Sequence, residues 1–258
     1  MNIEFLGLPG AGKTTIRKRI IEELTLRKHS TLSTEDAFYL KMKTSGDSIY
    51  RYILRLLPNG MGKKLANNLH GRSLYQNESQ NHFIACHGGS LRAFLNSVVF
   101  KNMSTEDKEN VIGNFLAMGS LWDMLNCQDF ANSILFFEEG FIQKSFMFVD
   151  HEYDYPSIAT NIHDYFQAIP LPNIVIHIKT DISTSYERML SRQDGLTKRL
   201  KNASPKAINT FLSHTEAHIQ NIRNELSLST DCQVIEITNE GDLNVTLNQL
   251  VDQVENYI

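Results

Sequence analysis

The stretch GLPGAGKTT, residues 7–15, decides the fold. It matches the pattern G-x-x-x-x-G-K-[ST], with Gly7, Gly12, Lys13 and Thr14 at the fixed positions. In such a loop the glycines let the backbone turn tightly, so that successive N–H groups point at phosphate oxygens. The lysine reaches the β- and γ-phosphates of a nucleotide, and the threonine hydroxyl ligates Mg²⁺. The sequence therefore predicts a phosphate-binding loop.

The residues around this loop provide the context that the motif requires. Residues 3–6 are apolar and predict a short buried strand, and apolar residues recur at helical spacing from Lys13 onward, with Arg17 assigned to the opposite, polar face. A strand, a glycine-rich turn and a helix make a chance match rare. We predict that the following residues bind the cofactor: Gly7, Pro9, Gly10, Ala11, Gly12, Lys13, Thr14 and Thr15.

The composition is that of a globular protein. The 258 residues are 41% hydrophobic and 21% charged, without low-complexity tracts, and predict a single domain over residues 1–258. The net charge of −4 gives no basic surface, so we expect neither a nucleic-acid nor a membrane partner. Three scattered cysteines suit a reducing compartment, and no apolar run approaches the roughly 20 residues of a membrane helix. These features predict a cytoplasmic location.

Four further apolar runs predict strands at residues 30–33, 133–137, 173–178 and 233–237. Their nearly continuous apolarity is typical of strands that are covered on both faces. Helical patterns lie between them, and the last one covers residues 243–254. Five strands alternating with helices predict an α/β fold with a doubly wound, mostly parallel, five-stranded sheet.

The long segment between the second and third strands, residues 40–130, predicts a helical insertion. Helical patterns cover residues 49–57, 81–100 and 106–126, and we expect breaks at Pro58-Asn59-Gly60 and at His87-Gly88-Gly89. We expect the insertion to pack over the edge of the sheet, on the side where a phosphoryl acceptor binds. The alternative is a packing subdomain without substrate contact.

Two pairs of acidic residues follow predicted strands, where ligands collect in open α/β sheets. Asp36, our first choice, or Glu35 would accept the proton of an attacking hydroxyl during phosphoryl transfer. Glu138 or Glu139, at the end of the third strand, would hold Mg²⁺. The alternatives are that the first pair only caps a helix and that the second is only solvated.

A segment after the fourth strand, residues 183–204, resembles a lid. Arg188 and Arg192 are four residues apart and share one helical face. Guanidinium groups on a movable segment can close over phosphates, neutralise charge in the transition state and exclude water. The alternative is an exposed basic face that interacts with solvent.

With the loop, the two acidic strand ends and the arginine helix in this order, the chain resembles the P-loop kinases of nucleosides, nucleotides and other small molecules, the thymidylate and adenylate kinase-like superfamily. Glu139-Gly140-Phe141 resembles the D-G-F segment of adenylate kinases, and residues 36–39 are similar to the D-D-F-Y segment of uridine kinase-like enzymes. The resemblance implies that Glu139 is the carboxylate beside magnesium and Asp36 the base. It also implies that Thr238 and Asn239 lie where this superfamily holds adenine.

The resemblance further implies an ATP-dependent phosphotransferase that uses Mg²⁺ and acts on a hydroxyl or phosphate of a small-molecule acceptor. Nucleosides, nucleotides, sugars and sugar nucleotides all stay open, because Gln143 stands where adenylate kinases carry the arginine that grips the acceptor nucleotide. A homodimer is also left open. Two other functions compete with the kinase: a nucleotide-dependent switch ATPase and a non-catalytic nucleotide-binding regulatory protein.

Overall fold

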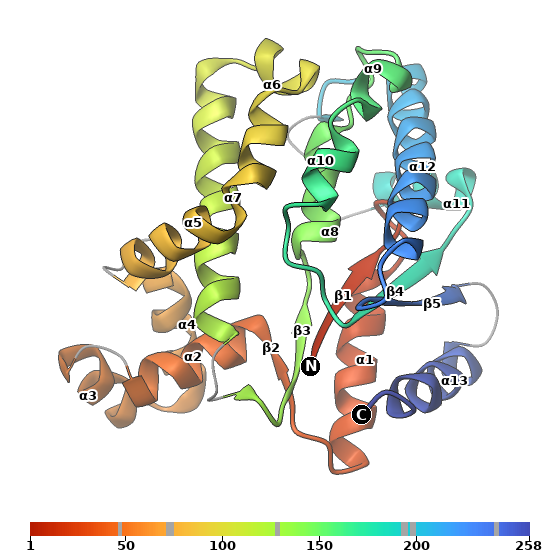
Figure 1. Ribbon diagram of the computed structural model, residues 1–258. Coiled ribbons are helices and arrows are strands. Elements are labelled where there is room, and N and C mark those ends of the chain that lie inside the picture. Colours follow the sequence, from red (N-terminus) through yellow and green to blue (C-terminus); the bar gives the residue numbers. More distant parts are fainter. Residues whose placement is uncertain (46–47, 71–74, 127–129, 192–195, 197–199, 240–242) are drawn as a thin grey trace.

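The structure is a computed structural model that describes residues 1–45, 48–70, 75–126, 130–191, 196, 200–239 and 243–258 (Figure 1). Five strands form one sheet in the order β2-β3-β1-β4-β5, and every neighbouring pair is parallel. The strands are β1 (Asn2–Leu6), β2 (Thr31–Ser33), β3 (Ile134–Phe137), β4 (Ile174–Lys179) and β5 (Gln233–Thr238). The predicted α/β fold with a five-stranded parallel sheet is confirmed, and each strand lies within a residue or two of its predicted position.

Helices cover both faces of the sheet, as expected for strands that are apolar on both sides. On one face, Ile3 and Phe5 of β1 pack against α1 (Lys13–Leu26) and α13 (Leu243–Glu255). On the other face, Leu6 and Val175 belong to a core shared with the later helices. These elements are α8 (Phe141–Lys144), the 3₁₀ helix η2 (Ser145–Phe148), α9 (Tyr155–Ala159), α10 (Ile162–Phe166), α11 (Ile182–Leu190) and α12 (Pro205–Ser227).

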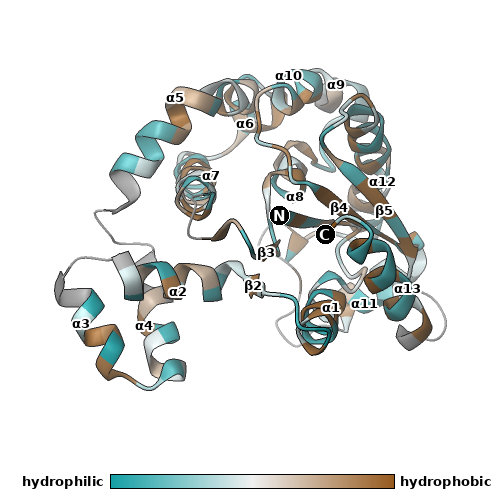
Figure 2. Cartoon of the chain, turned by 60° about the horizontal axis from the view of Figure 1, so that its bottom comes forward, coloured by the Kyte–Doolittle hydropathy of each residue, from teal (hydrophilic) through white to brown (hydrophobic). Residues whose placement is uncertain are grey.

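The described part of the segment between β2 and β3 consists of helices joined by short turns. Its helices are α2 (Thr34–Ser45), α3 (Ser48–Leu56), α4 (Asn59–His70), α5 (Tyr75–Leu95), α6 (Val98–Asn102) and α7 (Thr105–Leu125). A third core joins Phe38 of α2 and Leu125 of α7 to Phe137 of β3. Figure 2 shows α3 and α4 beyond α2, on the far side from the sheet. The insertion is thus attached to the sheet through α2 and α7.

The expected break at His87-Gly88-Gly89 is wrong, because α5 runs through it from Tyr75 to Leu95. Packing explains why glycine is tolerated inside this helix. A Cβ on Gly89 would lie 3.0 Å from the Cβ of Ala168, so the small residue allows a close approach. The hydroxyl of Ser90 also bonds to the carbonyl of His87 and supports the turn.

The sheet order brings three chain segments to one edge. β1 lies between β3 and β4, and β3 lies between β2 and β1. Because all strands are parallel, the residues that follow β1, β2 and β3 emerge side by side at the carboxyl edge. These are the GLPGAGKTT loop, the first turn of α2 and the Glu138–Gly140 turn. The topology alone therefore gathers the glycine loop and both acidic pairs.

Candidate active site

The loop between β1 and α1 turns at glycines whose backbone conformation other residues rarely adopt. Gly10 and Gly12 have φ angles of 90° and 92°, in the left-handed region that favours glycine. A Cβ on Gly10 would lie 2.8 Å from the carbonyl oxygen of Ser185, and one on Gly12 would lie 2.5 Å from Nδ2 of Asn239. Gly12 also precedes the first residue of α1, so the helix N-terminus points into the loop.

Lys13 reaches back over this loop. Its Nζ donates hydrogen bonds to the carbonyl oxygens of Gly7 at 2.7 Å and Leu8 at 3.0 Å. The ammonium therefore lies over the glycine loop. Thr14 and Thr15, the next two residues of α1, are exposed to solvent.

The end of β3 meets the start of α1 through two side chains. The hydroxyl of Thr14 donates a hydrogen bond of 2.7 Å to Oε1 of Glu138. The other carboxylate oxygen of Glu138 lies 2.5 Å from Nη2 of Arg17. A threonine hydroxyl and a carboxylate are hard oxygen donors of the kind that Mg²⁺ takes from proteins. These residues fit a magnesium ion bound beside the phosphate loop.

Glu139, the residue that the resemblance assigned to the metal, lies differently. Its Oε2 is 2.9 Å from Nζ of Lys144, and its side chain is 64% exposed. Partial desolvation by the surrounding protein raises the pKa of this carboxyl, but the nearby ammonium of Lys144 and then that of Lys13 outweigh it and hold the pKa below its usual value. Glu139 is therefore ionised and lies within the electrostatic reach of Lys13, whereas Glu138 makes the contact with Thr14.

The two acidic residues after β2 also separate. Oε2 of Glu35 lies 3.5 Å from Nη1 of Arg17, whose other nitrogen binds Glu138. Asp36 instead forms an ion pair with Lys63 of α4. Both residues are in the first turn of α2, where Ser33 accepts a hydrogen bond from the Asp36 amide. Glu35 thus belongs to the cluster at the phosphate loop, and Asp36 faces the insertion.

Arg17 is the site residue that the sequence reading missed. Helical spacing assigned it to a polar face, yet its side chain is only 9% exposed because it is enclosed between Glu35 and Glu138. Its Nε is buried and has no hydrogen-bond partner within the described part of the chain. Its position one helical turn after Lys13 is a signal that identifies it in retrospect.

The predicted lid and adenine residues lie on the other flank of the loop. Nδ2 of Asn239 donates to the carbonyl of Ala11 at 2.7 Å, and Nη2 of Arg188 lies 3.5 Å from the carbonyl oxygen of Asn239. Ser185 of α11 also donates a hydrogen bond to the carbonyl of Pro9. The structure therefore brings Arg188 and Asn239 together at the loop. Arg192 lies outside the described residues, as do residues 193–195 and 197–199 of the predicted lid segment 183–204.

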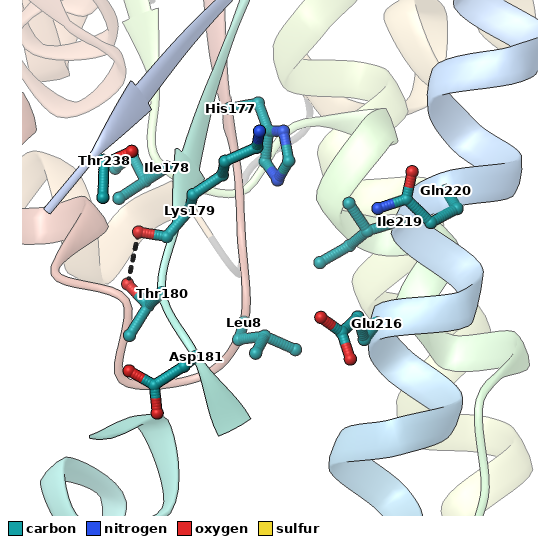
Figure 3. Close-up of a pocket in the computed structure, with 10 residues that line it drawn as sticks. All are labelled: Leu8, His177, Ile178, Lys179, Thr180, Asp181, Glu216, Ile219, Gln220 and Thr238. Atoms are coloured by element: carbon teal, nitrogen blue, oxygen red, sulfur yellow. Dashed lines mark hydrogen bonds between the residues drawn. The ribbon is translucent and has the colours of Figure 1, made fainter. Parts of the chain in front are cut away.

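Thr238, at the end of β5, lines a separate pocket of about 270 Å³ between the sheet and α12 (Figure 3). Leu8, Asp181 and Glu216 line the same pocket. Figure 3 shows Leu8, which belongs to the loop at residues 7–15, and Glu216, which belongs to α12, among the residues that line this pocket. Asn239 and Thr238 are neighbours in sequence but contact different parts of the structure.

The similarity of this chain to known proteins lies in its fold. No protein-family model matches it, and no curated protein matches it either. Solved structures of deoxyadenosine kinase from M. mycoides are similar over 99% of this chain. The one with bound dATP has a TM-score of 0.47 at 13% identity over 99% of that chain. The one with bound dCTP has a TM-score of 0.44 at 12% identity over 100% of that chain.

Proposed function

We propose that this protein is a kinase that transfers the γ-phosphoryl group of Mg·ATP to a hydroxyl group of a small molecule. The observation that carries the proposal is the 2.7 Å hydrogen bond between Thr14 and Glu138 at the mouth of the glycine loop. It joins the phosphate loop to the carboxylate of Glu138 at the end of β3. A P-loop phosphotransferase needs both of these parts around its metal ion.

The loop residues bind and orient the donor in this proposal. The backbone N–H groups between Gly7 and Thr14 hold phosphate oxygens, and Lys13 adds a positive charge beside them. Thr14 and Glu138 hold the metal, directly or through its water molecules. When bound, magnesium neutralises the charge that develops on the phosphate oxygens. Arg188 and Asn239 flank the loop on the side proposed for the nucleoside part of ATP.

Glu35 is the proposed general base. Its carboxylate is held near the loop by Arg17, whereas the carboxylate of Asp36 is paired with Lys63. A carboxylate at this place accepts the proton of the acceptor hydroxyl as that oxygen attacks the phosphoryl group. The helix that carries Glu35, α2, packs against α3, α4 and α7 of the insertion. The acceptor therefore binds between the loop and the insertion in this proposal.

The alternatives to a kinase differ from it in one measurable respect, the dependence of ADP release on an acceptor. A switch ATPase hydrolyses ATP without an acceptor, and a regulatory protein binds ATP without turnover. Nothing in the sequence provides the guanine-reading N-K-x-D segment of a GTPase: the chain reads Thr238-Asn239-Glu240-Gly241-Asp242 where such a segment would stand. The site of this chain is therefore assigned to ATP chemistry.

The experiment that tests this function measures ADP release from Mg·ATP against a panel of nucleosides, nucleoside monophosphates, sugars and sugar nucleotides. The phosphorylated product is confirmed by mass, and a reaction without acceptor is the control. Lys13→Ala is expected to abolish turnover. Acceptor-dependent release supports the kinase and names its substrate class. Acceptor-independent release, or full activity of the Lys13→Ala variant, contradicts the proposal.

A further inference from the structure

A carboxylate is buried in the central strand of the sheet, below the phosphate loop. Glu4 lies in β1, and only 1% of its surface is exposed. An ionised carboxylate that leaves water costs several kcal/mol unless hydrogen bonds or charges compensate for the lost hydration. The partners of Glu4 therefore identify what this residue does in the fold.

Those partners are the first amides of α8. The N–H of Phe141 donates to one carboxylate oxygen at 3.1 Å, and the N–H of Ile142 donates to the other at 2.8 Å. Gly140 lies so close to the same carboxylate that any side chain at this position would overlap it. The turn that leaves β3 is therefore shaped around the carboxylate of Glu4.

The strand register places this contact close to the candidate metal site. Glu4 pairs with Phe137, the last residue of β3. The sheet fixes Phe137, and Glu4 fixes the amide of Phe141. Only the Glu138–Gly140 turn lies between these two anchors, and Glu138 is the residue whose carboxylate accepts the Thr14 hydrogen bond.

The first turn of α8 is also anchored through its carbonyl groups. The hydroxyl of Tyr165 donates to the carbonyl oxygen of Phe141 at 2.9 Å, and the hydroxyl of Ser145 donates to that of Ile142 at 2.7 Å. The amides and carbonyls of this turn thus have buried partners on different elements. Glu4 provides the anchor on the side of the phosphate loop, since its strand continues into Gly7.

We propose that Glu4 is a positioning residue for the metal side of the phosphate site: its carboxylate holds the Glu138–Gly140 turn so that Glu138 meets Thr14. This inference rests on the proposed function. A carboxylate suits the task because its two oxygens accept both amide hydrogens at once. Residues that orient metal ligands in this way typically change metal affinity by about tenfold or more when they are replaced.

The test separates nucleotide binding from its dependence on magnesium. ATP binding is measured calorimetrically at about pH 8, where the Glu4 carboxyl is ionised, first with EDTA and then across a Mg²⁺ titration, for the unmodified protein and for Glu4→Gln. Glutamine has nearly the same size as glutamate. Its NH₂ group is a hydrogen-bond donor, however, and would face the N–H of Phe141 or Ile142, which is also a donor. We expect the Mg²⁺ concentration at half-saturation to rise by about tenfold, while ATP binding in EDTA stays within about twofold of the unmodified protein.

Phe5→Leu is the matched control for an effect on stability alone. Phe5 is the next residue of the same strand, is buried, and packs on the opposite face against α1 and α13. The Phe5→Leu variant is expected to have a lower melting temperature but an unchanged Mg²⁺ concentration at half-saturation. A Glu4→Gln protein with unchanged magnesium dependence and a lowered melting temperature would overturn the positioning role while leaving the kinase proposal intact. Absence of ATP binding by the unmodified protein would overturn both.

A second pair of variants approaches the same contact from Gly140. The methyl group of Gly140→Ala overlaps the Glu4 carboxylate, so this variant is expected to lose stability and to require more Mg²⁺. Adding Glu4→Ala makes room for the methyl group but removes the acceptor of both amides. The double variant should regain melting temperature without regaining magnesium affinity. Recovery of magnesium affinity together with stability would show that the glutamate is dispensable and would overturn the proposal.

Discussion

Thr14 and Glu138 are 124 positions apart in sequence, yet the hydroxyl of one donates a 2.7 Å hydrogen bond to the carboxylate of the other. The parallel pairing of β1 with β3 brings them together, because both strands end at the same edge of the sheet. This contact distinguishes Glu138 from its neighbour Glu139, whose carboxylate pairs with Lys144.

The first prediction concerns these two glutamates. Glu138→Gln should lower Mg²⁺-dependent turnover by about 100-fold, because a metal-orienting carboxylate is lost beside the phosphates. Glu139→Gln is the matched control and should lower turnover by less than about threefold. Both are measured as kcat and as the Mg²⁺ concentration at half-maximal rate. Equal losses in the two variants would remove the distinction between the two side chains.

The second prediction separates the two acidic residues of α2. Glu35→Gln should lower kcat by about 100-fold with little change in ATP affinity, since a general base acts in the transition state. Asp36→Asn removes a partly exposed ion pair with Lys63, and such pairs contribute about 1 kcal/mol or less to stability. Its kcat should stay within about threefold of the unmodified protein. The opposite ranking would return the base role to Asp36.

The sequence was sufficient to predict the parallel sheet and the phosphate loop, since both depend on local patterns. Short apolar runs mark the strands, and the spacing of Gly7, Gly12, Lys13 and Thr14 marks the loop. The all-parallel pairing follows from the helices that separate the strands. These features need no knowledge of which side chains meet across the fold.

The choice between Glu138 and Glu139 could not be made from sequence, because it depends on how the chain turns after β3. That turn is shaped by Glu4, which is more than 130 positions away. Arg17 was misread for a similar reason. Its helical position predicts a polar, exposed face. In the fold, Glu35 of α2 and Glu138 after β3 lie against this face and enclose the Arg17 side chain.

The third prediction concerns the stability of the fold at neutral pH. Burial raises the pKa of Glu4 to about 7, although the amides of Ile142 and Phe141 work in the opposite direction. In the unfolded chain this carboxyl titrates near 4.5. Between these values the folded state binds more protons, so the stability that Glu4 contributes is fully present below about pH 4.5 and is lost as the pH rises through 7.

The size of this loss follows from the shift. About 2.5 pKa units at 1.36 kcal/mol each correspond to roughly 3 kcal/mol. Glu4→Gln does not titrate, so the difference in unfolding free energy between it and the unmodified protein should change by roughly this amount from pH 4.5 to pH 8. Urea unfolding at a series of pH values measures it. A difference that does not depend on pH would mean that Glu4 titrates normally.

The fourth prediction concerns a buried histidine and acid unfolding. His218 of α12 is completely buried, and its Nε2 lies 2.9 Å from the hydroxyl of Ser145. Burial lowers its pKa to about 3, from the usual 6.5. The folded state therefore holds this histidine neutral while the unfolded state takes up a proton. The stabilisation is fully present above pH 6.5 and is lost as the pH falls toward 3.

Between pH 4.5 and 6.5 the stability contributed by Glu4 falls as the pH rises, whereas that contributed by His218 increases. These two pH dependences largely cancel in the unmodified protein. Glu4→Gln removes one of them, and its stability should fall by up to about 1.4 kcal/mol for each pH unit below 6.5. His218→Gln removes the other, and its stability should instead rise as the pH falls from 7 to 4.5. Urea unfolding of both variants across this range measures the two slopes separately. Slopes of the same sign would show that one of these buried groups titrates at its ordinary pKa.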